Sequence, residues 1–141
     1  MIKHIRYFLS PLVLFVGILA ILKGNYYPIS FIIIFDVLIA LGDSYLKKDR
    51  GFFNNPMPII LNSSLYINLP LLYIFISLVL FVLVDYHSQW YISVWNYLNI
   101  DIIKVRSNIT FADMCSLLLY STPLFIATMG TNVGHELTHR K

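Results

Sequence analysis

Four apolar runs constrain what this chain can fold into more than any other feature. The clearest is residues 65–84, a stretch of 20 residues without a charge. An α-helix rises 1.5 Å per residue, so about 20 apolar residues cross the roughly 30 Å hydrocarbon core of a bilayer. A helix also satisfies its own backbone hydrogen bonds, which lipid cannot do. The run therefore predicts a transmembrane helix.

The other three runs are residues 5–22, 27–42 and 111–133. The turn between the first two is short enough to make them antiparallel neighbours. The last run contains Pro123 near its middle, where a proline is expected to kink a helix. We predict an all-α integral membrane bundle of four transmembrane helices, forming a single domain over residues 1–141.

The composition supports this class and excludes others. Hydrophobic residues make up 58% of the chain and charged residues 12%, which is typical of a protein dissolved in lipid. The ten Lys and Arg residues are scattered at the edges of apolar runs and form no basic face, so we predict no nucleic-acid binding. The single cysteine, Cys115, excludes a disulfide framework or a cysteine-based zinc site within the chain.

Two polar segments separate the later runs. Residues 42–64 are charged and then rich in Asn and Pro, which predicts a loop with interfacial turns. Residues 85–110 are aromatic, and we predict an interfacial segment with Trp90 and Trp95 as anchors at the boundary between lipid and water. The first run, although preceded by basic residues, is long and lacks a small-x-small cleavage pattern, so it is expected to be a retained helix rather than a signal peptide.

The distribution of Lys and Arg predicts the orientation, because cytoplasmic loops carry an excess of them. Four spans place seven of these residues on one side and three on the other. The seven are Lys3, Arg6, Lys47, Lys48, Arg50, Arg140 and Lys141, and the three are Lys23, Lys104 and Arg106. We therefore expect a multi-pass protein of the inner (plasma) membrane with both termini in the cytoplasm.

Chemistry is concentrated after the fourth run, in the sequence His135-Glu136-Leu137-Thr138-His139. In a helix the two histidines stand at i and i+4 on one face, and their rings can converge on one cation. Glu136 points roughly 100° away from His135, so it suits an acid-base or supporting role better than direct ligation. We predict His135 and His139 as metal ligands and Glu136 as the catalytic candidate.

The bare pattern leaves several functions open. H-E-x-x-H in metalloproteases places two imidazoles on zinc with the glutamate as general base, so a membrane zinc metalloprotease is one alternative. Two spaced histidines at a solvated helix end, in a non-catalytic membrane protein, is another. Ionisable clusters at a membrane edge are costly, which favours a functional site.

The wider context resembles a more specific family. Asn132-Val133-Gly134 followed by the histidine motif, Arg140 and Lys141 resembles the first histidine box of the AlkB-type alkane 1-monooxygenases, within the membrane fatty acid desaturase and hydroxylase superfamily. The stretch from Phe35 to Asp43, followed by Asn55-Pro56, is similar to the acidic, Gly-Asp and Asn-Pro stretch of that family. The resemblance covers this whole chain but only the N-terminal part of a typical family member.

The resemblance implies a membrane-bound, non-haem di-iron monooxygenase that hydroxylates alkane or fatty-acyl chains. His135 and His139 would be iron ligands, and imidazole is a suitable ligand for iron. Rubredoxin and rubredoxin reductase would supply electrons, and the substrate would enter from the bilayer.

The chain departs from the family in one respect that matters for activity. The later histidine boxes are absent, and His4 and His87 do not replace them. Our expectation is therefore a truncated and inactive fragment of such an enzyme. A desaturase of the same superfamily is a close alternative, because its first box spaces histidines in the same way.

Other polar and small residues carry weaker expectations. Asp36 and Asp43 are seven residues apart and share a helix face, and we expect Asp36 near a helix end, paired with a polar neighbour. Asp113 precedes His135 by 22 residues, about 33 Å along a helix, so it is expected at the opposite surface and outside the metal site. Gly130 and Gly134 form a G-x-x-x-G pair, which favours close helix packing.

Overall fold

The computed structural model describes residues 8–45, 58–84 and 88–130, and these residues form helices joined by turns, with no strand among them. The helices are α2 (Leu9–Lys23), α3 (Tyr27–Tyr45), α4 (Pro58–Leu83), α5 (Gln89–Tyr97) and α6 (Ile102–Ser107). A final helical run contains α7 (Phe111–Ser116), η2 (Leu117–Ser121), α8 (Thr122–Phe125) and η3 (Ile126–Gly130). The all-α prediction is confirmed.

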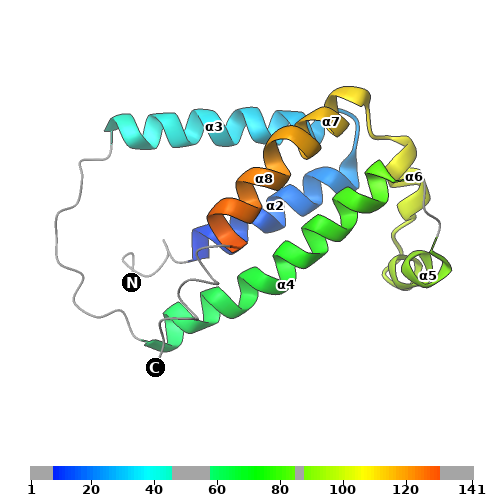
Figure 1. The fold of residues 1–141 in the computed structure, drawn as a ribbon, viewed down its shortest axis with the longest axis horizontal. Helices are drawn as coiled ribbons and strands as arrows, with labels where there is room; N and C mark the ends of the chain where they lie inside the picture. Colours follow the sequence, from blue (N-terminus) through cyan, green and yellow to red (C-terminus); the bar gives the residue numbers. More distant parts are fainter. Residues whose placement is uncertain (1–7, 46–57, 85–87, 131–141) are drawn as a thin grey trace.

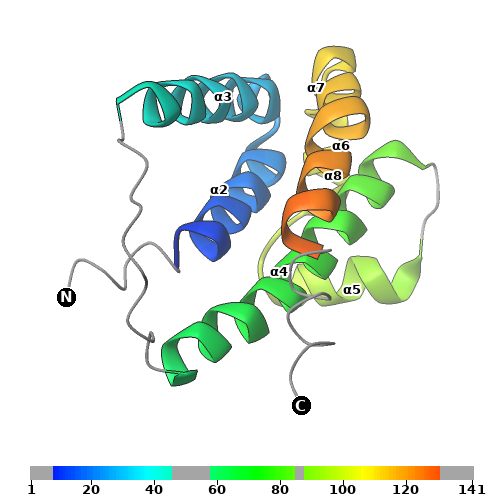
Figure 2. The same cartoon turned by 60° about the vertical axis from the view of Figure 1, so that its left-hand side comes forward.

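The long helices form a bundle with its short helices at one end. Helix α2 packs against both α3 and α4. The first part of the final helical run, α7 and η2, contacts α3, and its last part, α8 and η3, contacts α4. Figure 1 shows α5 and α6 at the end of the bundle where α2 turns into α3. Figure 2 shows the final run crossing beside α4. The end of α3 and the start of α4 both lie at the other end of the bundle (Figure 1).

Two helical stretches are long and apolar enough to cross a membrane, by length and composition. They are Tyr66–Leu83 within α4 and Phe111–Thr128 within the final run. Leu9–Lys23 and Tyr27–Leu41 are apolar but shorter. This agrees in part with the four predicted spans, of which the third and fourth reach the necessary length among the described residues.

The predicted loop at residues 42–64 is wrong at both ends. Helix α3 continues to Tyr45, and α4 begins at Pro58. The last turn of α3 and the first turns of α4 contain polar residues. The change to a polar composition therefore did not mark the residues at which these helices end and begin. Residues 46–57 lie outside the described part of the chain.

An aromatic cluster joins the long helices inside the bundle. The rings of Phe75 in α4 and Phe125 in α8 meet edge to face, with centroids 5.0 Å apart. Phe31 and Phe35 of α3 lie beside Phe125, with centroids 6.4 and 6.2 Å away. Gly17 of α2 lies against this cluster, and a Cβ at that position would be 3.3 Å from the Phe31 ring.

The final helical run is widened around Pro123 into two π-helical segments, η2 and η3. A proline cannot donate to the carbonyl one turn back, and its ring crowds that carbonyl. Side-chain hydroxyls bond to carbonyls in this region: Ser121 Oγ donates to Ser116 O at 2.9 Å, and Thr122 Oγ1 donates to Leu117 O at 2.7 Å. The local response to Pro123 is thus a pair of wide turns within a continuous helical run, and the kink stays a prediction.

Candidate functional site

The histidine motif lies outside the described residues, which end at Gly130. The predicted ligands His135 and His139, the candidate Glu136, and Gly134 all belong to that segment, and His4 and His87 are also outside the described part. Within the described ranges, no group of three or more His, Cys, Asp or Glu side chains could hold a metal ion. The described structure therefore contributes the helical run that leads to the motif, and the motif's geometry stays a prediction.

A polar pair joins α3 to the final helical run. The hydroxyl of Tyr120 donates a 2.7 Å hydrogen bond to Oδ1 of Asp36. We predicted a polar partner for Asp36, and this is confirmed. The predicted position near a helix end is wrong, because Asp36 lies midway along α3. The side chain of Asp43, expected on the same face, lies outside what the structure describes.

The surroundings of this pair are apolar. Val37 and Leu38 beside Asp36 are exposed, as are Leu118 and Leu119 beside Tyr120. A carboxylate in such surroundings is costly unless it accepts hydrogen bonds, and the Tyr120 hydroxyl provides one. Sequence reasoning missed Tyr120, because nothing in its local sequence connects it to a residue 84 positions earlier.

Asp113 is the most highly connected carboxylate among the described residues. Its side chain is 0% exposed. Oδ2 accepts hydrogen bonds from the backbone N–H of Tyr26 at 3.0 Å, the N–H of Thr110 at 3.1 Å and the Thr110 hydroxyl at 2.7 Å. Oδ1 accepts from the N–H of Ile29 at 3.2 Å. The carboxylate thus binds the start of α3 to the start of α7.

The turn between α2 and α3 explains why this carboxylate is needed. Gly24, Asn25 and Tyr26 have φ values of 65°, 49° and 65°, a left-handed conformation that non-glycine residues rarely adopt. Asn25 N–H donates to the carbonyl of Asn108 at 2.8 Å, and Tyr26 N–H donates to Asp113. The turn is therefore held by residues more than 80 positions away in the sequence.

Asp113 was predicted at the membrane surface opposite the histidine motif, and that location stays a prediction. It lies in the first turn of α7, at the opposite end of the final run from Gly130, and its side chain is buried within the protein. A local signal for part of its role was present, because Thr110-x-x-Asp113 is a capping-box pattern and both of its hydrogen bonds form. Its contacts with α3 had no such signal.

Asn68 is a second buried polar side chain, 6% exposed, in α4. Its Oδ1 accepts a 3.2 Å hydrogen bond from Ser10 Oγ of α2. Hydrogen bonds between helices are a common form of association in membrane bundles. The pair connects α2 and α4 and brings no ionisable group with it, which favours a structural role.

The two tryptophans of the aromatic segment have different environments. Trp90 is 74% exposed, whereas Trp95 is 8% exposed and packs edge to face with Tyr91, with centroids 6.1 Å apart. Trp95 belongs to the hydrophobic core together with Ile92 and Ile102. The prediction that both act as surface anchors is wrong for Trp95, because one face of α5 is turned toward the bundle.

Comparisons with protein-family models, with curated proteins and with solved structures found no match for this chain. Its function is therefore argued from the sequence motif and from the surfaces and contacts described above.

Proposed function

We propose that this chain is a four-span membrane protein that supplies part of a non-haem iron oxygenase acting on alkane or fatty-acyl chains, with His135 and His139 as iron ligands. The observation that carries the proposal is the position of the motif. His135-Glu136-x-x-His139 begins five residues after Gly130, the last described residue of the final helical run, in a bundle whose long helices are apolar on the outside.

The apolar exterior supports membrane insertion of all four long helices. Large hydrophobic side chains are exposed on each of them, including the two shorter ones. Examples are Leu12 and Phe15 on α2, Ile33 and Leu38 on α3, Ile67 and Leu80 on α4, and Leu119 and Ile126 on the final run. A water-soluble monomer rarely exposes such extensive contiguous apolar surface, whereas lipid solvates it without cost.

The described basic residues support the proposed orientation. Lys23 ends α2, Lys104 and Arg106 lie in α6, and α2 and α6 contact each other. These three residues therefore gather at one end of the bundle. The other seven basic residues belong to segments that precede, connect or follow the helices at the opposite end. The count of seven against three favours a cytoplasmic position for that opposite end, which supports the proposed orientation in the inner (plasma) membrane.

The donor chemistry of the motif suits iron, but two imidazoles are too few for a di-iron centre. The described residues offer no further group of ligands. The proposal thus requires histidines in addition to His135 and His139, and the nucleotide sequence that follows the Lys141 codon is the first place to look for them. When complete, such a centre supplies O2 activation, with electrons from rubredoxin and its reductase in the resembling family.

Metal titration of the purified chain tests the ligand assignment. The full 141-residue chain in lipid nanodiscs, first stripped of metal, is titrated anaerobically with Fe(II) and, separately, with Zn(II). We expect iron binding that is lost in His135→Ala and His139→Ala and retained in His87→Ala, the matched control. Equal iron binding by all four proteins would remove the basis of the proposal.

The same titration separates the alternatives. Tighter binding of zinc than of iron is expected for any imidazole site and decides nothing. A zinc metalloprotease is favoured if the zinc-loaded chain hydrolyses a peptide substrate and Glu136→Gln abolishes this activity while zinc binding is kept. Binding of neither metal favours a non-catalytic membrane protein. Stoichiometric iron with O2-dependent hydroxylation by this chain alone would show that it is a complete enzyme and that the expected incompleteness is wrong.

A further inference from the structure

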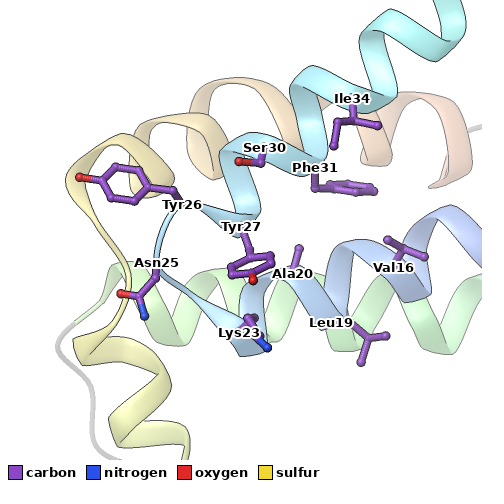
Figure 3. A pocket seen from close by; sticks show the side chains of 10 residues that line it. All are labelled: Val16, Leu19, Ala20, Lys23, Asn25, Tyr26, Tyr27, Ser30, Phe31 and Ile34. Carbon is purple, nitrogen blue, oxygen red and sulfur yellow. The ribbon is translucent and has the colours of Figure 1, made fainter.

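A groove of about 530 Å³ runs between α2 and α3 on the outside of the bundle (Figure 3). Its volume is in the range of small-molecule and lipid sites. The lining residues are Val16, Leu19, Ala20 and Lys23 from α2, Asn25 and Tyr26 from the turn, and Tyr27, Ser30, Phe31 and Ile34 from α3.

The two helices line the groove with matching faces. The α2 residues follow the spacing i, i+3, i+4 and i+7 from Val16, and the α3 residues follow the same spacing from Tyr27. Side chains with this spacing share one face of a helix. Figure 3 shows Val16 and Ala20 on the side of α2 that faces α3, with Leu19 and Lys23 along the neighbouring edge of α2. The groove is therefore a continuous slot along two antiparallel helices.

The chemistry of the groove changes along its length. Val16, Leu19 and Ile34 make one part apolar, whereas Lys23 and the Tyr27 ring lie at the end next to the turn (Figure 3). The Lys23 ammonium is 5.4 Å from the centre of the Tyr27 ring, a cation–π contact. Within the described part of the chain, no carboxylate forms an ion pair with this ammonium. An anion can approach Lys23 without displacing an acidic partner.

We propose that this groove binds an anionic phospholipid of the surrounding bilayer, with an acyl chain in the slot and the phosphate at Lys23. The ammonium provides the charge complementarity, and its place at a helix end corresponds to the headgroup level. The slot from Val16 to Lys23 is about 10 Å long, which stays within one leaflet of a bilayer about 30 Å thick. An alkane, which is uncharged, would leave Lys23 without an anionic partner.

This inference rests on the membrane insertion proposed above and is independent of the iron motif. Extraction of membranes at alkaline pH is therefore the first step. A chain that is released into the soluble fraction would contradict insertion itself, whereas a chain that stays in the membrane allows the lipid site to be tested separately.

Lipid retention measures the selectivity for charge. The full chain in nanodiscs containing equal phosphatidylglycerol and phosphatidylcholine is released into mild detergent, and the retained lipids are counted by native mass spectrometry. We expect phosphatidylglycerol to be retained about fivefold over phosphatidylcholine, the ratio that one lysine near an anionic headgroup provides. Lys23→Gln should remove the preference, and Lys23→Arg should keep it. Lys104→Gln, an exposed lysine at the same end of the bundle, is the control and should leave it unchanged.

Filling the slot tests the position of the acyl chain. Ile34→Trp should reduce the retained lipid, because Ile34 lines the groove. Val37→Trp, at a similarly exposed position of α3 outside the groove, should not. Three results would each overturn the proposal. The unaltered chain could retain the two lipids equally, Lys23→Gln could leave the preference unchanged, or Ile34→Trp and Val37→Trp could reduce the retained lipid equally.

Discussion

The Tyr120 hydroxyl bonds to the Asp36 carboxylate at 2.7 Å and so joins the middle of α3 to the final helical run. Both residues lie near the centre of their helical runs, in apolar surroundings. For a polar pair in apolar surroundings, the loss of one partner and the loss of both have different effects on stability. Removal of one partner leaves the other without its hydrogen bond, whereas apolar replacement of both can be nearly neutral.

The asymmetry predicts the outcome of three variants. Tyr120→Phe should destabilise the bundle, because Asp36 then lies in apolar surroundings without its hydrogen-bond donor. The double variant Asp36→Leu with Tyr120→Phe should recover most of the lost stability. Unfolding in mixed micelles with increasing dodecyl sulfate measures both. Tyr73→Phe, an exposed tyrosine of α4, is the control. A double variant less stable than Tyr120→Phe would contradict the interpretation.

Asp113→Ala should be the most destabilising of the carboxylate substitutions in the described part of the chain. It removes the acceptor from three part-buried backbone N–H groups, and a donor left without a partner costs up to about 1–3 kcal/mol. We expect a loss of at least about 3 kcal/mol in the free energy of unfolding.

Two comparisons sharpen the Asp113 test. Asp113→Asn keeps one acceptor oxygen and should lie between the wild type and Asp113→Ala. Asp101→Ala removes a single cap contact, from the N–H of Lys104 at 3.1 Å, and should cost only about 1 kcal/mol. Similar losses for Asp113→Ala and Asp101→Ala would show that Asp113 does not hold the turn.

Gly24→Ala should destabilise the turn between α2 and α3. The position has a φ of 65°, and an added Cβ would lie 2.8 Å from Cβ of Asn108. Strained backbone of this kind costs about 1–3 kcal/mol, and the overlap adds to it. Gly17→Ala is the contrast, because alanine gains up to about 1 kcal/mol of helix propensity there and Phe31 has to move only slightly. The midpoint of thermal unfolding in detergent measures both, and a smaller loss for Gly24→Ala than for Gly17→Ala would contradict the strain argument.

Substitution of the two tryptophans of α5 should change the free energy of unfolding by very different amounts. Trp95→Ala should cost about 3–5 kcal/mol, as expected for a large core side chain. Trp90→Ala should change the free energy of unfolding by less than about 0.5 kcal/mol, because its side chain is largely exposed. Equal losses would mean that Trp95 is not part of the core. Denaturant titration followed by circular dichroism provides the comparison.

The helices could be predicted from sequence because each apolar run is long and carries few charges. Their ends could not, because α3 and α4 continue through polar residues that resemble a loop in composition. The burial of Trp95 was missed for a related reason: an aromatic segment typical of a membrane interface contains a short helix, and Ile92 and Trp95 on one of its faces point inward.

The polar contacts between helices were beyond sequence reasoning for a different reason. The partners of Asp36 and Asp113 lie 84 and 87 residues away, and only the packed bundle brings them together. The capping box at Thr110 was readable because its two members are three residues apart. The histidine motif was readable in the same way, and its assignment as an iron site stays a prediction because it lies outside the described residues.

The turn after α2 also has a consequence for biosynthesis. Translation proceeds from the N-terminal toward the C-terminal side, yet the acceptors for the N–H groups of Asn25 and Tyr26 are Asn108 and Asp113. The helical hairpin of α2 and α3 is synthesised early, but its bend cannot form these two hydrogen bonds until more than 80 further residues have been synthesised. The turn between α2 and α3 can thus reach its final hydrogen bonding only after Asn108 and Asp113 have been synthesised.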